Sequence, residues 1–202
     1  MAKDCGKHGN DHLFRSAIAC IVFLVIVVLL IVLIVFLVLR PHKPKFYLQD
    51  ATVLSFNLSS PNLLSTYLQV TVSSKNPNNR VGVYYDRLDV YASYMNQQIT
   101  LPSPIVPHYQ GHNDVDVWSP YLRGDAVPIA PFLAAALSQD ESDGYFFLWI
   151  KIDGKLRWKV GSWRSGHYHL FVNCPAYLSF DRSRSSNPSI RFQRIATCSV
   201  DI

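Results

Sequence analysis

The stretch that decides the architecture is SAIACIVFLVIVVLLIVLIVFLVL, residues 16–39, in which no side chain is charged. A helix rises about 1.5 Å per residue, so a run of this length reaches roughly 36 Å, enough to cross a hydrocarbon core of about 30 Å with some tilt. A long core helix of a soluble protein normally carries a polar stripe, and this run has none. Arg15 and Arg40 flank it, where cationic side chains can reach lipid headgroups. The sequence therefore predicts a membrane-spanning helix.

The length of the run also bears on whether it is removed after export. The apolar part of a cleaved signal peptide is usually about 7–15 residues long and ends at a small-x-small site. This run is longer and continues into Arg40 and Pro41 without such a site. We expect an uncleaved signal anchor, with a cleaved signal of unusual form as the alternative. The predicted organisation is a tail at 1–15, a span at 16–39, a stem at 40–45 and a folded domain at 46–202.

Composition restricts the kind of domain that follows the span. The whole chain has 202 residues and a net charge of +5, and its basic residues are dispersed. A nucleic-acid-binding protein would show a clustered basic stripe, so we expect no nucleic-acid partner. All but one of the carboxylate side chains are Asp, the exception being Glu141. Because Asp favours turns and Glu favours helices, this imbalance indicates a β-rich domain with many loops.

The orientation of the span is not fixed by charge, because three Lys or Arg residues lie near each end (Lys3, Lys7 and Arg15 against Arg40, Lys43 and Lys45). Two other features favour an outward domain and a cytosolic tail. Asn57 heads an N-glycosylation sequon, and Cys174 and Cys198 are the only cysteines of the domain, a pair that suits an oxidising compartment. A chance sequon and two buried thiols are the alternatives. Cys5, in the tail, is a candidate for palmitoylation or an ordinary thiol.

Strand patterns fill most of the domain. Within residues 63–73, one alternating set of side chains is mostly apolar and the other mostly polar, which is typical of a strand with one buried face: Leu64, Thr66, Leu68, Val70 and Val72 against Ser65, Tyr67, Gln69, Thr71 and Ser73. We expect one helix, over the Ala-rich residues 128–139. Asp153-Gly154 predicts a hairpin turn between strands at 144–152 and 155–160, and Asp86-Arg87 separates two further strands. The predicted fold is a two-sheet antiparallel β-sandwich, similar to immunoglobulin and fibronectin III domains, with one α-helix behind a transmembrane helix.

No set of residues assembles into a catalytic or metal site in the sequence. His167 and His169 have a spacing that metal sites use, but no third ligand is near in sequence, so we expect no metal. The tripeptide Arg123-Gly124-Asp125 occurs in some adhesion ligands, where a turn holds the two charges apart, although Gly-Asp is also ordinary turn chemistry. We expect no catalytic residues and no cofactor.

Four segments in chain order carry a resemblance to a known family: NPNNRVGVYYD at 76–86, PHYQGHN at 107–113, LRWKVGSW at 156–163, and the cysteine-containing end at 169–175 and 198–200. They resemble the signatures of plant harpin-induced-like proteins, also called NHL proteins, which are similar to the non-race-specific disease resistance protein. His108 departs from this pattern, which often has an aromatic residue there. The motif residues are Asn76, Pro77, Asn78, Tyr84, Tyr85, Tyr109, Gln110, Gly111, Trp158 and Gly161.

The resemblance implies a late-embryogenesis-abundant group 2 domain at the plant plasma membrane, plasmodesmata included, acting in defence or stress without catalysis. The expected partners are membrane or wall proteins, and homo- or hetero-oligomers are also expected. Tyr84, Tyr85 and Tyr109 are candidate contact residues. The alternative for each of them is packing in the core or at its rim. The alternative is a lipid-binding or tethering module, in which the apolar residues 145–150 line a groove between the sheets. A continuous cavity there would support this alternative.

Overall fold

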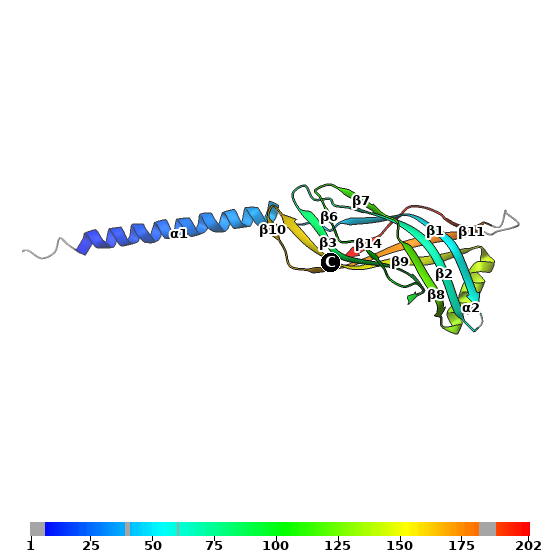
Figure 1. Ribbon diagram of the computed structural model, residues 1–202. Coiled ribbons are helices and arrows are strands. Elements are labelled where there is room, and N and C mark those ends of the chain that lie inside the picture. The colour runs from blue at the N-terminus through cyan, green and yellow to red at the C-terminus, as the bar shows by residue number, and fades with distance from the viewer. Residues whose placement is uncertain (1–6, 39–40, 60, 182–188) are drawn as a thin grey trace, which may run out of the picture. The chain divides into compact units, whose positions relative to one another are not determined.

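The computed structural model describes residues 7–38, 41–59, 61–181 and 189–202. The chain divides into two compact units, residues 1–40 and residues 41–202. The first unit contains one helix, α1 (Lys7–Val38), drawn in blue in Figure 1. Its residues Phe14–Leu33 are long and apolar enough to cross a bilayer, and none of this stretch is buried. The helix starts N-terminal to the predicted membrane span, whose first residue is 16. The predicted end at Leu39 lies outside the described residues.

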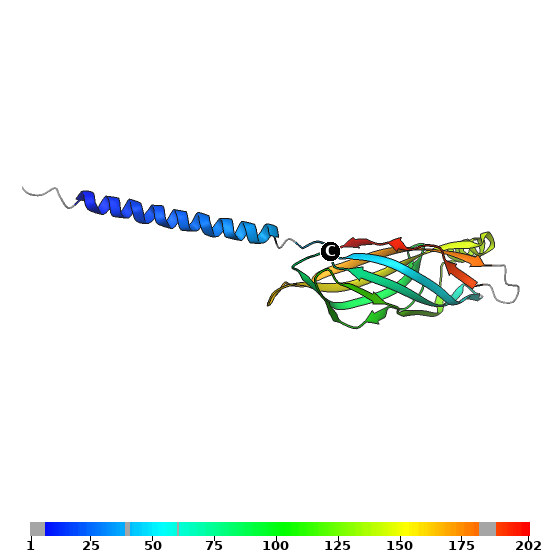
Figure 2. The same ribbon diagram turned by 90° about the horizontal axis from the view of Figure 1, so that it is seen from above.

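The second unit is a sandwich of two antiparallel layers, as predicted (Figures 1 and 2). One layer contains β4 (Gln97–Gln98), β3 (Gly82–Tyr94), β9 (Tyr145–Val160) and β11 (Tyr168–Asp181). The other contains β1 (Lys45–Ser59), β2 (Leu63–Lys75), β7 (Val115–Trp118) and β8 (Tyr121–Pro128). Four short strands extend the layers: β5 (Ser103–Ile105) and β6 (His108–Gln110) along β3, β10 (Trp163–Arg164) along β9, and β12 (Ser189–Phe192), which joins β11 to β1.

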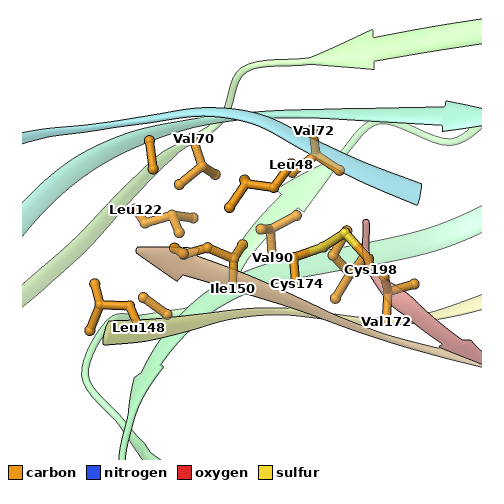
Figure 3. Packing of buried hydrophobic residues seen from close by; sticks show 14 of the residues in the cluster. Leu48, Val70, Val72, Val90, Leu122, Leu148, Ile150, Val172, Cys174 and Cys198 are labelled. Atoms are coloured by element: carbon orange, nitrogen blue, oxygen red, sulfur yellow. A yellow bond between two sulfur atoms is a disulfide. The ribbon is translucent and has the colours of Figure 1, made fainter. Parts of the chain in front are cut away.

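The core lies between the layers and is built from alternate residues of the long strands. Leu48 and Val70 from one layer face Val90, Ile150 and Val172 from the other, and each is at most 1% exposed (Figure 3). The predicted strand at 63–73 fits this alternation, since a strand directs successive side chains to opposite faces.

The C-terminal segment bridges the two layers. β13 (Ala196–Thr197) pairs with β1, and β14 (Ser199–Asp201) pairs with β11. Between them, Cys198 donates its backbone N–H to Phe46 O at 3.0 Å and is joined through its sulfur to Cys174 of β11 (Figure 3). The end of the chain is therefore held to both layers at once.

The helix of the domain, α2 (Pro131–Asp143), covers one end of the sandwich (Figure 1). It starts with Pro131 in the first turn and ends at Gly144, whose φ of 89° suits glycine. Leu133, Ala134 and Leu137 face the core. The hydroxyl of Tyr94 donates to Asp140 Oδ2 at 2.7 Å, which fixes the helix against β3. The predicted helix at 128–139 is thus shifted toward the C-terminus, beginning at its second proline.

The predicted hairpin at Asp153-Gly154 is wrong, because β9 runs straight through it as one strand. Gly154 pairs with Leu88 on one side and Leu170 on the other. A Cβ on Gly154 would lie 2.3 Å from Arg87 O, beside a register shift of β3 between Tyr85 and Arg87. Glycine is therefore needed here because the backbone of β3 approaches that of β9 closely, and not because the chain turns. The predicted break at Asp86-Arg87 is likewise wrong, because a bulge within the continuous β3 replaces it.

Candidate functional site

The Asn76-Pro77-Asn78 segment lies at the end of the sandwich where residues 41–44 begin the domain, which we call the stem end. The Asn76 amide Nδ2 donates to Val81 O at 2.8 Å and to Gly111 O at 2.7 Å. Its Oδ1 accepts from the backbone N–H of Asn78 at 3.1 Å and from Asn78 Nδ2 at 2.8 Å. Both asparagines are buried, so their amides satisfy backbone groups that water cannot reach.

Asn78 connects this segment to the first residues of the domain. Its Oδ1 accepts from the backbone N–H of His42 at 2.7 Å, and its Nδ2 donates to His42 O at 2.8 Å. The two bonds mimic one rung of a β-ladder. Asn78 therefore fixes the position at which the chain enters the sandwich.

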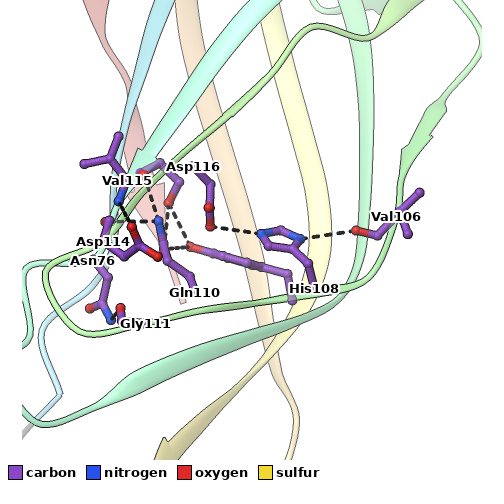
Figure 4. Close-up of polar contacts among 10 residues, drawn as sticks. Asn76, Val106, His108, Gln110, Gly111, Asp114, Val115 and Asp116 are labelled. Carbon is purple, nitrogen blue, oxygen red and sulfur yellow. Dashed lines mark hydrogen bonds and ion pairs between the residues drawn. The ribbon is translucent and has the colours of Figure 1, made fainter.

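Tyr85 and Gln110 form a second buried network next to this segment. Tyr85 Oη lies 2.8 Å from Ser74 Oγ and donates to Gln110 Oε1 at 3.1 Å. Gln110 Nε2 donates to Ser74 O at 2.8 Å and to Asp114 O at 3.2 Å (Figure 4). Burial raises the pKa of the Tyr85 hydroxyl above its ordinary value, and the hydrogen bond with Ser74 partly offsets this. Because Tyr85 is only 1% exposed, it packs in the core and offers no contact area.

His108 lies over the same network and pairs with a carboxylate. Its Nε2 is 3.2 Å from Asp116 Oδ2, and its Nδ1 is 3.2 Å from Val106 O (Figure 4). The ring stacks on Tyr85 at 5.1 Å and meets Trp118 edge-on at 4.9 Å. Burial raises the pKa of Asp116, and the neighbouring His108 lowers it. The imidazole thus occupies an aromatic packing position, which explains how the sandwich accommodates a histidine there.

The polar partners of His108 are the Asp116 carboxylate and the backbone carbonyl of Val106. Among the described residues, no group of three His, Cys, Asp or Glu side chains has an arrangement that could hold a metal ion. The contacts described so far show the motif residues holding the loops of the stem end together.

The outer face of the stem end carries a group of aromatic and cationic side chains, which we call the basic–aromatic cluster: Tyr84, Tyr109, Lys159 and Arg164. The rings of Tyr84 and Tyr109 lie 4.6 Å apart. Lys159 Nζ lies 4.8 Å from the Tyr109 ring centre, and Arg164 Cζ lies 4.4 Å from that of Tyr84. These distances are typical of cation–π contacts. Tyr109 lies over Gly82, where a Cβ would be 2.3 Å from the Tyr109 hydroxyl oxygen.

The other motif residues shape the strand ends below this cluster. Trp158 is buried, and its backbone N–H donates to Ser165 Oγ at 2.9 Å. Gly161 has a φ of 56° in the turn between β9 and β10, a conformation that favours glycine. Pro77 is half-buried between the two structural asparagines. The three motif segments, far apart in sequence, therefore meet at one end of the domain.

The tripeptide Arg123-Gly124-Asp125 does not form a turn, which corrects the sequence interpretation. It lies within β8, and Arg123 Nε donates to Asp125 Oδ1 at 2.9 Å. A Cβ on Gly124 would lie 2.1 Å from Ile99 O. The glycine is needed for strand packing, and the two charges pair with each other instead of being held apart.

The remaining predicted residues are dispersed over the domain. Asn57 is exposed on β1, in register with Ser65 of β2. His167 approaches Asp86 at 3.6 Å, whereas His169 stacks on Phe171 at 6.0 Å, so the two imidazoles have different partners. Cys174 and Cys198 are bonded to each other, and Cys5 lies outside the described residues.

The structure does not favour the apolar groove along residues 145–150 that the alternative, lipid-binding function needs. Phe146, Leu148 and Ile150 face the core and are at most 3% exposed, so a water-sized probe scarcely reaches them. An acyl-chain groove would leave its lining accessible, whereas these side chains are in contact with other core residues.

Sequence reasoning missed four participants: Ser74, Asp116, Lys159 and Arg164. Each lies in or next to a strand of the structure, but its partner is distant in the chain. Lys159 pairs in register with Gly82, and only that register brings it to Tyr84 and Tyr109. Alternation within each strand indicated the outer face, but no local pattern could have supplied the register.

Comparison with known proteins places these features in a family. A family described as "Late embryogenesis abundant protein" matches residues 71–174. NDR1/HIN1-like protein 1 of Arabidopsis thaliana is 47% identical over 99% of this chain and 100% of its own length. Two further relatives come from the same plant. NDR1/HIN1-like protein 12 is 46% identical over 99% of this chain and 99% of its own length. NDR1/HIN1-like protein 26 is 41% identical over 94% of this chain and 84% of its own length. The chain therefore belongs to the NDR1/HIN1-like family of plant stress and defence proteins and carries a late embryogenesis abundant domain.

Proposed function

We propose that this protein is a single-pass plasma-membrane protein of plant defence and stress responses, whose β-sandwich faces away from the cytosol and binds protein or wall partners without catalysis. The anchor is α1, with its apolar stretch Phe14–Leu33. The observation that carries the outward placement is the bond between Cys174 and Cys198, because such bonds persist in oxidising compartments. The tail before α1 then lies in the cytosol.

The accessibility of Asn57 supports the same orientation. Its side chain is exposed on β1, so a glycan there would extend into solvent without disturbing the core. Glycosylation of asparagine takes place on the lumenal side of the secretory pathway. A glycan at this site would therefore report directly on which side of the membrane the domain folds.

The outer face of β9 and β11 is the surface best suited to a protein or wall partner. Tyr145, Phe171 and Tyr177 are exposed by 67%, 48% and 41%. Arg194 Cζ lies 5.0 Å from the Tyr177 ring centre. Large aromatic side chains provide much contact area at a low cost in conformational entropy, which is why they are enriched in interfaces. Pairing of such surfaces between copies of related chains would also give homo- or hetero-oligomers.

The orientation can be tested on the full chain expressed in plant cells and recovered in sealed microsomes. We expect an endoglycosidase to increase gel mobility of the wild type and to have no effect on the Asn57→Gln variant. We also expect added protease to spare the domain unless detergent opens the vesicles. Cleavage of the domain in sealed, cytosolic-side-out microsomes, together with an absent mobility shift, would contradict the proposed topology.

A further inference from the structure

Alternate residues of β9 place a row of cationic side chains on the outer face of the sandwich. Lys155, Arg157 and Lys159 lie on the same face, because a strand directs every second side chain to one side and the residues between them are buried. Arg164 pairs in register with Lys159 and extends the row onto β10. We call these residues the basic row. At about 3.4 Å per residue, the part of the row on β9 is roughly 14 Å long.

Most of the charge of the basic row is not neutralised by carboxylates of the domain. Arg157 is the exception, because its Nε donates to Asp86 Oδ2 at 2.8 Å. Within the described parts of the chain, no carboxylate lies within 4.0 Å of the side-chain nitrogens of Lys155, Lys159 or Arg164. The row therefore presents a net positive charge that an anionic ligand can neutralise.

Two tyrosines of the basic–aromatic cluster hold the end of the row in a defined position. Arg164 Nη2 donates to the Tyr84 hydroxyl at 3.2 Å while its guanidinium lies over the ring. Stacking uses the face of the guanidinium and leaves part of its N–H edge free, the part that binds carboxylate oxygens in a fork. Lys159 Nζ lies 4.8 Å from the Tyr109 ring centre and 5.6 Å from that of Tyr84. The positions of both charges are therefore set before any ligand arrives.

Exposed rings flank the other end of the row on the neighbouring strand. His169 of β11 pairs in register with Lys155, and its ring stacks on that of the exposed Phe171 at 6.0 Å. The electron-rich face of an aromatic ring packs against the C–H face of a sugar ring. Asp153, the register partner of Phe171, offers carboxylate oxygens that accept hydrogen bonds from sugar hydroxyls. Cations and rings thus occur together on one face of the sheet.

We infer that the basic row binds an acidic polysaccharide, a polyuronate whose carboxylates repeat along a stiff chain. Lys155, Lys159 and Arg164 contact separate carboxylates of the ligand, and the ring of Phe171 lies against one of its sugar rings. A fixed row of charges on a strand suits a stiff ligand better than a flexible acidic peptide, because less conformational entropy is lost on binding. This inference rests on the proposed outward placement of the domain, and it names the chemistry of the wall partner.

The test uses the full chain in nanodiscs of phosphatidylcholine, which has no net charge, immobilised on a sensor in calcium-free buffer. The probes are de-esterified polygalacturonate and the same polysaccharide with its carboxylates methyl-esterified. We expect the charged form to bind at least about tenfold more tightly than the ester at roughly 0.1 M salt, and to dissociate at about 1 M, where the screening length is about 3 Å. Equal binding of the two forms, or binding of neither, would overturn the inference.

Charge variants assign the binding to the basic row. Lys159→Gln/Arg164→Gln should weaken the binding of polygalacturonate by at least about tenfold, because two charged contacts are lost. The matched control Lys45→Gln/Lys75→Gln removes the same charge from exposed lysines of the other layer and should bind like the wild type. Lys155→Gln, which leaves the tyrosine contacts intact, should also weaken binding. Equal loss in both double variants, or wild-type binding by Lys155→Gln, would contradict the assignment to the row.

A second polyanion distinguishes an acidic sugar chain from an acidic peptide. Polyglutamate of matched charge should bind more weakly than polygalacturonate, and Phe171→Ala should reduce only the binding of polygalacturonate. Equal affinity for both polyanions would refute the polyuronate as the ligand. The microsome experiment on Asn57 decides the topology independently. A cytosolic domain refutes the proposed function whatever the sensor measures, whereas an outward domain that does not bind polygalacturonate refutes this inference alone.

Discussion

Single side chains at the stem end act through hydrogen bonds to backbone groups that strands and turns leave unsatisfied. Asn76 and Asn78 bond the backbone of residues 42, 78, 81 and 111, and Gln110 bonds that of residues 74 and 114. A buried amide without its partner costs about 1–3 kcal/mol, so each of these side chains matters for the position of the loops. This explains why the motif contains amides and a tyrosine rather than aliphatic residues.

Because of Tyr85, the free energy of unfolding of the domain should decrease at alkaline pH. Its folded-state pKa is raised above 10.0 by burial, so its contribution is complete below pH 10 and is lost as pH rises beyond that, because only the unfolded chain releases the proton. We expect the free energy of unfolding to fall above pH 10, and to fall less steeply in Tyr85→Phe. The measurement is urea unfolding of the full chain in detergent, followed by near-ultraviolet circular dichroism. If the free energy of unfolding of the wild type and of Tyr85→Phe fell equally with pH, the pH dependence could not be assigned to Tyr85.

The elements of the sandwich differ in how well the sequence specified them. β2 was predictable because its side chains alternate between a packed and an open face. β9 was not, because Asp153-Gly154 has the composition of a hairpin turn while Gly154 serves the close approach of Arg87 O. A local pattern cannot distinguish these two uses of glycine, since the deciding atom lies on another strand. The contacts of Lys159 and of His108 depend on pairing between distant segments for the same reason.

Gly154→Ala should therefore destabilise the pairing of β3 with β9. Its Cβ would lie 2.3 Å from a backbone oxygen that can move only with the strand, so we expect a loss of roughly 1–3 kcal/mol in the free energy of unfolding. Gly166→Ala is the control, because its Cβ would meet nothing within 4 Å, and a change within about 0.5 kcal/mol is expected. Urea unfolding of both variants measures the difference. Equal, small effects of the two substitutions would contradict the close backbone approach at Gly154.

At the scale of the whole molecule, the sandwich depends on segments beyond the matched family region. That region covers residues 71–174, whereas β1 and the C-terminal segment lie outside it. The C-terminal segment pairs with β1 through β13 and with β11 through β14. The bond between Cys174 and Cys198 fixes the arrangement at the point where the segment passes from one layer to the other.

Loss of this disulfide should weaken the whole domain. It closes a loop with a sequence separation of 24, for which chain entropy predicts about 3 kcal/mol of stabilisation. We expect a reducing agent to lower the urea midpoint of the wild type by a corresponding amount. The variant Cys174→Ala/Cys198→Ala should unfold at the lower midpoint and be insensitive to the reducing agent. An unchanged wild-type midpoint after complete reduction would contradict the role given to this bond.

The pairing of β1 with β2 has a mechanical consequence for a protein tethered by its stem. If the opposing force acts at the far end of the sandwich, a pull transmitted through residues 41–44 reaches β1 at Lys45 and acts along the length of the strand. Register pairs from Lys45↔Lys75 to Ser59↔Leu63 connect the two strands along their length. A force along this axis loads those backbone bonds in shear, so they must break together instead of opening one after another. If α1 anchors the chain and a partner holds the far end of the sandwich, as proposed above, β1 would carry the tension between them.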